Sequence, residues 1–125
     1  MEDKDTFFSK KYLINCNGSL IDLSIPRIMG ILNITPDSFY DGGRYLQKEA
    51  ITAQLEKLIA EGADIIDIGG YSSRPGADHI SPKEEYERII PVLEFIRVNY
   101  PKLILSVDTF RSEIARKVVE DFCVD

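Results

Sequence analysis

The chain has 125 residues, of which 44% are hydrophobic and 29% are charged, and this composition is typical of one globular domain with its own apolar core. The formal net charge is −6 and the 15 basic residues are scattered along the chain, which argues against a nucleic-acid partner. No apolar run approaches the roughly 18 residues of a membrane span, and no apolar signal core follows the charged N-terminus. The two cysteines, Cys16 and Cys123, fit no metal or redox motif, so we expect reduced thiols in a cytoplasmic protein.

The N-terminal part of the chain predicts a hairpin and then a buried strand. Residues 1–11 are mostly polar, with Phe7 and Phe8 as exceptions, and we expect them to be disordered. Apolar runs at 12–16 and 20–24 flank Asn17-Gly18, a pair that tolerates positive φ and favours a β-hairpin. The nearly continuous apolar run at 28–34 predicts a strand that is covered on both faces, as in a parallel sheet.

Helical and strand patterns then alternate to the end of the chain. The clearest boundary is at Ser81, where Pro82 and Glu84 complete a capping box. Alternation of this kind implies right-handed crossovers and an α/β fold with a parallel sheet. The expected elements are a helix over 48–61, a strand over 64–68, a helix from 81, a strand over 103–107, a helix over 112–120 and the start of a fourth strand at 122–124.

Polar residues stand at the expected carboxyl ends of the strands, where parallel α/β folds gather their functional groups. Asn33 interrupts the first apolar run. Its amide oxygen suits a hard cation such as Mg²⁺, and a buried amide satisfied by backbone groups is an equal alternative. Asp108 ends the third run and is expected to be partly buried, so its carboxylate needs a partner. That partner comes from the protein or from a ligand, and a ligand with an N–C–N edge is one good solution. The plain alternative is that Asp108 caps the following helix.

The loops after the first and second strands carry further candidates, each with a plain structural alternative. Asp37 follows a proline, where aspartate is common for turn reasons alone. Arg74 can pair with a phosphate or carboxylate through its planar guanidinium, although exposed arginines are usual. The hydroxyls of Ser73 and Thr109 are weak signals, because such groups also cap helices.

An acidic cluster and a lone histidine point to no site. Glu84, Glu85 and Glu87 fall in a first helical turn, where negative charge suits the helix dipole, and we expect all three to be solvated. His79 is the only histidine and is expected at the surface. Neither feature has metal-ligand spacing with a partner.

Three segments resemble the signatures of dihydropteroate synthases. The first is residues 29–39, MGILNITPDSF, followed by Asp41-Gly42-Gly43. The second is residues 62–70, GADIIDIGG, followed by SSRPG at 72–76, and the third is SVDT at 106–109. These long motifs keep the order and spacing of the family over about residues 20 to 125. Tyr71-Ser72-Ser73-Arg74 departs from the more familiar Glu-Ser-Thr-Arg: a hydroxyl is kept at 73, whereas a carboxylate is lost at 71.

The resemblance implies a fold and a limit. The family fold is the (β/α)₈ or TIM barrel, which needs about 250 residues. Residues 1–125 are therefore expected to form the N-terminal portion of such a barrel, with the hairpin, about three β/α units and the start of a fourth strand. The family's later pterin-pocket and phosphate-binding residues lie beyond this length, so we expect the chain alone to be inactive.

The resemblance also implies a reaction. Dihydropteroate synthases condense 7,8-dihydropterin pyrophosphate with p-aminobenzoate, giving dihydropteroate and pyrophosphate in folate biosynthesis, with Mg²⁺ as cofactor. The arylamine attacks the pterin methylene carbon and pyrophosphate leaves. A homodimer is expected of the full-length protein.

Individual roles follow by position in the motifs. Asn33 resembles the ligand of the metal and of the pyrophosphate. Asp37 resembles the catalytic carboxylate of the first loop, which helps stabilise the electron-poor methylene. Ser73 and Arg74 resemble the phosphate-serving hydroxyl and guanidinium of the second loop, and Asp108 resembles the acid that pairs with the pterin's nitrogen edge. The remaining substrate-binding candidates are in the first loop: Thr35, Ser38 and Phe39, the last as a wall of the p-aminobenzoate pocket.

Two other interpretations remain open. A methyltetrahydrofolate-binding barrel shares the pterin-binding architecture, but the loop at 35–39 and the segment Ser73-Arg74-Pro75-Gly76 suit pyrophosphate and arylamine better. A non-catalytic half-barrel that associates with itself is the alternative from another class, because open strand edges invite pairing.

Overall fold

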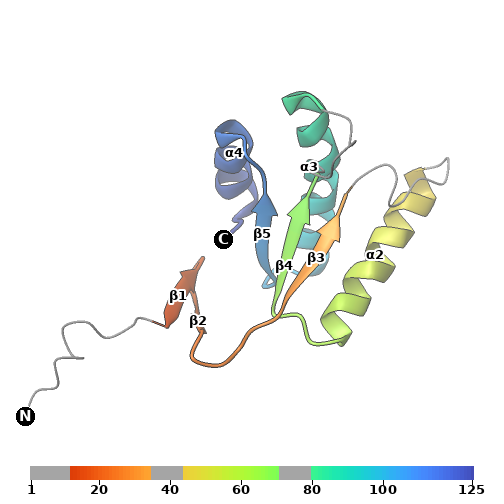
Figure 1. Cartoon of the computed structure of the whole chain (residues 1–125). Coiled ribbons are helices and arrows are strands. Elements are labelled where there is room, and N and C mark those ends of the chain that lie inside the picture. Colours follow the sequence, from red (N-terminus) through yellow and green to blue (C-terminus); the bar gives the residue numbers. More distant parts are fainter. Residues whose placement is uncertain (1–11, 35–43, 71–79) are drawn as a thin grey trace, which may run out of the picture.

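The structure is a computed structural model that describes residues 12–34, 44–70 and 80–125 (Figure 1). Residues 1–11 lie outside the described part of the chain, so their expected disorder stays a prediction. The mixed α/β architecture expected from the sequence is confirmed. The elements in chain order are β1 Leu13–Cys16, β2 Ser19–Asp22, β3 Met29–Asn33, α2 Arg44–Ala60, β4 Ile65–Gly69, α3 Pro82–Asn99, β5 Ile104–Asp108 and α4 Ser112–Phe122.

Strands β1 and β2 form the predicted antiparallel hairpin. Its turn is Asn17-Gly18, and both residues have positive φ, 48° and 89°. The Gly18 N–H donates a 2.8 Å hydrogen bond to Asn15 Oδ1. Cys16 is one of the hairpin's buried side chains; burial, and after it the negative charge of Asp125, raises the pKa of its thiol. The thiol is therefore protonated at neutral pH.

Strands β3, β4 and β5 pair in that order as a parallel sheet (Figure 1). The register places Met29, Ile65 and Ile104 in one row and Asn33, Gly69 and Asp108 in another. The three strands thus end at the same level, as the βαβ pattern predicts.

The helices cover one face of this sheet. Side chains of β3, β4 and β5 alternate, because successive residues of a strand point to opposite faces. One set forms a single buried cluster with α2, α3 and α4, which includes Leu32, Ile66, Ile68, Leu105, Ile51, Leu55, Ile89, Leu93, Ile96, Ile114 and Val118. This cluster is the core of the molecule.

The other face of the sheet is open. Met29 and Ile31 are 50% and 59% exposed, although the apolar run at 28–34 had predicted a strand covered on both faces. The difference arises because a barrel covers its inner face with side chains from strands across the lumen. Three neighbouring strands within the described residues cannot supply that cover.

Residues 122–124, expected to begin a fourth strand, instead finish and cap helix α4. Phe122 is its last residue, and Cys123 has the left-handed φ of 52° that ends many helices. The chain reaches the edge of β5 two residues after Cys123, where the Asp125 N–H donates to the Leu105 carbonyl oxygen over 2.9 Å.

Arg97 fixes this path. Its guanidinium donates to the carbonyl oxygens of Phe122 (2.6 Å), Cys123 (2.6 Å) and Leu103 (2.7 Å). One side chain of α3 therefore holds both the end of α4 and the entry to β5. The planar fork of arginine suits three diverging carbonyls, whereas an ammonium group does not.

Replacing Arg97 with lysine is expected to lower the free energy of unfolding by about 2 kcal/mol, because hydrogen bonds from a charged donor are lost while the charge is kept. Urea denaturation followed by circular dichroism measures this. Arg116→Lys, at an exposed position of α4, is the matched control and should change stability by less than about 0.5 kcal/mol. Equal stability of the two variants would contradict the role given to Arg97.

Candidate functional site

The carboxyl ends of β3, β4 and β5 bring two of the predicted site residues together. Asn33 and Asp108 lie in the same row, on either side of Gly69. A Cβ atom at Gly69 would lie 3.8 Å from Asn33 Oδ1 and 3.8 Å from Asp108 Cβ. The amide and the carboxylate therefore flank a position that carries no side chain, on the open face of the sheet.

Asp108 is exposed, which corrects the expectation that it is partly buried. Leu105 and Val107 point toward the helices, so Asp108 points to the opposite face, which nothing covers within the described residues. It does not cap the next helix, since the N-cap residue of α4 is Arg111. The helix-cap alternative is therefore excluded. The exposed carboxylate needs no protein partner, and its pairing with a ligand stays a prediction.

Asn33 is exposed as well, so the alternative of a buried amide satisfied by backbone does not apply. Within residues 12–34, 44–70 and 80–125, no group of three or more His, Cys, Asp or Glu side chains could hold a metal ion. Asn33 thus offers one oxygen ligand at the carboxyl end of β3, on the open face of the sheet.

A second polar pair lies one row deeper on the same face. The Ser106 hydroxyl donates a 2.7 Å hydrogen bond to Asp67 Oδ1, across the pairing of β4 and β5. Asp67 is not among the site residues predicted from the sequence, although it interrupts an apolar strand as Asn33 does. This polar pair lies next to Asn33 and Asp108 on the open face, two residues earlier along strands β4 and β5.

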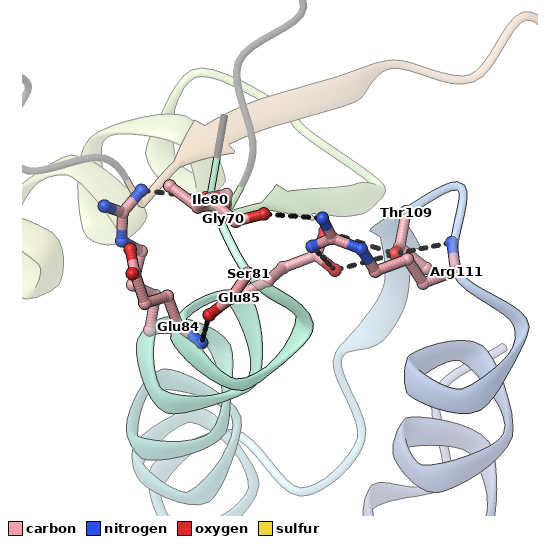
Figure 2. A network of polar contacts seen from close by, with 8 residues as sticks. Gly70, Ile80, Ser81, Glu84, Glu85, Thr109 and Arg111 are labelled. Carbon is pink, nitrogen blue, oxygen red and sulfur yellow. Dashed lines mark hydrogen bonds and ion pairs between the residues drawn. The ribbon is translucent and has the colours of Figure 1, made fainter. Parts of the chain in front are cut away.

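Glu85, in the first turn of α3, is completely buried at 0% exposure, whereas the acidic cluster had been expected to be solvated. Its carboxylate accepts a hydrogen bond from the Thr109 hydroxyl, at 3.1 and 3.2 Å from its two oxygens, and forms a 3.4 Å ion pair with Arg111 (Figure 2). The reason for burial is this pairing: a carboxylate can leave water when a cation and a donor replace it.

The same region holds both ends of the segment 71–79 (Figure 2). Arg111 donates a 2.6 Å hydrogen bond to the Ile80 carbonyl oxygen, and Arg88 donates a 3.2 Å bond to that of Gly70. Ser81 is the N-cap of α3 and accepts from the Glu84 N–H over 3.1 Å, which confirms the predicted helix start.

The other predicted site residues lie outside the described part of the chain, and so does His79. Their positions stay predictions. They are Thr35, Asp37, Ser38, Phe39, Ser73 and Arg74.

A groove of about 700 Å³ runs between α2 and α3, with Lys48, Arg88 and Phe95 among its lining residues. It lies on the helical layer, and neither Asn33 nor Asp108 lines it. The strand ends, where polar groups meet, are therefore the candidate site.

No helix in the described part of the chain is long and apolar enough to cross a membrane.

The chain is similar in sequence and in fold to dihydropteroate synthases. The dihydropteroate synthase of Haemophilus influenzae is 48% identical over 101 residues, which are 81% of this chain and 36% of that protein. The structure of Xanthomonas albilineans dihydropteroate synthase with 4-aminobenzoic acid superposes with a TM-score of 0.78 at 46% identity, over 88% of this chain and 40% of that one. Burkholderia cenocepacia dihydropteroate synthase complexed with 7,8-dihydropteroate gives a TM-score of 0.72 at 34% identity, over 90% of this chain and 36% of that one.

The chain thus spans little more than a third of the length of these relatives. The structural match nevertheless extends over 88% and 90% of this chain. Residues 29–124 match the family described as pterin binding enzyme, and the chain belongs to that family.

Proposed function

We propose that this chain supplies the first part of the active site of a dihydropteroate synthase. The reaction condenses 7,8-dihydropterin pyrophosphate with p-aminobenzoate to give dihydropteroate and pyrophosphate. The observation that carries the proposal is the row Asn33, Gly69 and Asp108 at the carboxyl edge of the sheet, in a chain that is 48% identical to a dihydropteroate synthase.

Asp108 is proposed to bind the pterin. Its carboxylate is exposed on the open face and has two oxygens that can accept two parallel N–H donors. A pterin presents such a pair along its N–C–N edge, and charge-assisted bidentate pairing combines affinity with a fixed orientation. The empty position at Gly69 leaves room for a flat ring beside the carboxylate.

Asn33 is proposed to contribute to a Mg²⁺ site together with the substrate's pyrophosphate. Mg²⁺ keeps several waters and is commonly bound by one or two protein oxygens plus substrate phosphates. One exposed amide oxygen fits that mode. When bound, Mg²⁺ would offset the charge that develops on the departing pyrophosphate.

The residues of the two loops complete the proposal by their motif positions. In the reaction the p-aminobenzoate nitrogen forms a bond to the pterin methylene carbon as the bond from that carbon to pyrophosphate breaks. The nitrogen then loses a proton. Asp37 is proposed to stabilise the electron-poor methylene, and Phe39 to line the arylamine pocket with Thr35 and Ser38 nearby. Ser73 and Arg74 are proposed to bind phosphate.

Self-association of the chain is a second candidate, favoured by the exposure of Met29 and Ile31 on the open sheet face. Apolar surface of this kind is stabilised when a second surface covers it. A cytoplasmic location and a homodimer of the full-length protein are also proposed. The two free cysteines support the former, because reducing compartments keep thiols unpaired.

Replacing Asp108 with asparagine is expected to weaken binding of 7,8-dihydropterin pyrophosphate by about ten- to a hundredfold, because a charged acceptor is lost. Isothermal titration calorimetry measures the affinity. Asp121→Asn, on the exposed side of α4, is the control and should bind as the unmodified chain does. Unchanged affinity of Asp108→Asn would overturn the assignment.

Replacing Asn33 with alanine is expected to abolish the Mg²⁺ dependence of pyrophosphate binding, whereas Asn33→Asp keeps an oxygen ligand and should retain it. Titrating inorganic pyrophosphate at several Mg²⁺ concentrations gives the dependence. Asn99→Ala, at an exposed helix end, is the control. The same Mg²⁺ dependence in all variants would exclude Asn33 as a ligand.

The 125-residue chain alone is expected to form no dihydropteroate from the two substrates and Mg²⁺, because the described sheet holds three strands of a barrel that closes only with the full set. Mass spectrometry detects the product and light scattering gives the mass in solution. Product that disappears in Asp108→Asn would show a working site and contradict this expectation. A clean monomer would argue against self-association.

A further inference from the structure

Glu85 is the one buried charged residue of the described chain, and the reaction proposed above gives it no part. Within the described chain, its carboxylate contacts two groups of the turn that follows β5: the Thr109 hydroxyl and the Arg111 guanidinium. A carboxylate is costly to bury unless its partners are held in place. Glu85 and the turn therefore fix one another.

Thr109 is the central contact of this arrangement. Its hydroxyl donates to Glu85 and at the same time accepts the Arg111 backbone N–H over 3.2 Å (Figure 2). Thr109 immediately follows Asp108 along the chain. The peptide on the carboxyl side of Asp108 is thus held by two hydrogen bonds, neither of which uses the Asp108 carboxylate.

Arg111 extends the network to the second loop. Its guanidinium forms the ion pair with Glu85 (3.4 Å) and donates to the Ile80 carbonyl oxygen (2.6 Å). Its side chain is only 17% exposed, so solvent competes weakly for these contacts. Ile80 is the residue at which the chain leaves the segment 71–79.

We propose that Glu85, Thr109 and Arg111 form a positioning network that fixes the direction of the Asp108 carboxylate and its distance from the end of the second loop. This inference rests on the proposed role of Asp108 in pterin binding. The three residues touch no substrate themselves. They act by preventing rotation of the turn after β5, so that the carboxylate is oriented before the ligand arrives.

The competing explanation is that these contacts only stabilise the fold as a whole. The two explanations differ in which residues lose protection from exchange when a contact is removed. A positioning network confines the effect of its removal to residues 108–111 and 80. A purely stabilising contact lowers protection throughout the core, including Ile66 at the centre of β4, which is 0% exposed.

The test compares Thr109→Val, which removes the hydroxyl and keeps the shape, with Thr109→Ser, which keeps the hydroxyl. Thr52→Val is the matched control, because the Thr52 hydroxyl also donates to a backbone carbonyl, that of Lys48 at 2.8 Å, but far from the network. Each chain is labelled with ¹⁵N, and amide hydrogen exchange and ¹⁵N relaxation are measured without ligand.

In Thr109→Val, amide exchange at Arg111 is expected to accelerate about tenfold, and the order parameter of the Asp108 amide to fall from roughly 0.85 toward 0.6. Ile66 should keep its protection, and Thr109→Ser and Thr52→Val should match the unmodified chain. An unchanged order parameter at Asp108, or equal acceleration at Ile66 and Arg111, would overturn the proposal. If Thr109→Val does not fold, Glu85→Gln is measured in its place with the same expected pattern.

A measurement of ligand binding distinguishes failure of this inference from failure of the proposed function. Thr109→Val should bind 7,8-dihydropterin pyrophosphate about tenfold more weakly than Thr109→Ser. Equal affinities would overturn the positioning role even if exchange at Arg111 changes. An unmodified chain that does not bind the pterin at all contradicts the proposed function of this chain, while the relaxation data still decide whether the network orients Asp108.

Discussion

Strands β3, β4 and β5 pair in parallel with a register that places Asn33, Gly69 and Asp108 in one row. Everything proposed for the site depends on this register. A shift of one residue in any strand would turn its polar end toward the helices and its apolar residues toward the open face, because side chains alternate with period two. Burial of Leu32, Ile66 and Leu105 at 0% exposure makes such a shift costly, since each loses about 1.5–3 kcal/mol of hydrophobic stabilisation when exposed.

Helix α3 packs closely against the end of β4. A Cβ atom at Gly70 would lie 2.9 Å from Ile89 Cγ1 and 3.4 Å from the Glu85 carbonyl oxygen. Only glycine permits this approach. Because Ile89 and Glu85 are one helical turn apart, the same contact that seats the helix on the sheet also brings the Glu85 carboxylate to the end of β5.

Features that depend on neighbouring residues were predictable from the sequence. Asn17-Gly18 forms a turn because both residues accept positive φ, and Ser81 caps α3 because its hydroxyl reaches an N–H three residues ahead. Contacts between distant residues were not. The acidic first turn of α3 favours solvated carboxylates, and only Thr109 and Arg111, more than twenty residues later, explain why Glu85 is buried. The end of α4 likewise depends on Arg97, some 25 residues earlier.

The sequence predicted that Asn33 and Asp108 stand at neighbouring strand ends, as the register shows. It did not predict their exposure, because exposure depends on what covers the inner face of the sheet. The structure also shows how one strand end can serve two purposes. Consecutive residues at the end of β5 point in opposite directions, so Asp108 faces the open side and Thr109 faces α3. A contact to Thr109 can therefore orient Asp108 while leaving both carboxylate oxygens free to bind a ligand.

Replacing the Glu85–Arg111 pair with apolar side chains of similar volume can even be stabilising, by about 1–4 kcal/mol in other proteins. On that reasoning, stability alone is a weak explanation for a buried pair at this position, and orientation of the neighbouring carboxylate is the stronger one.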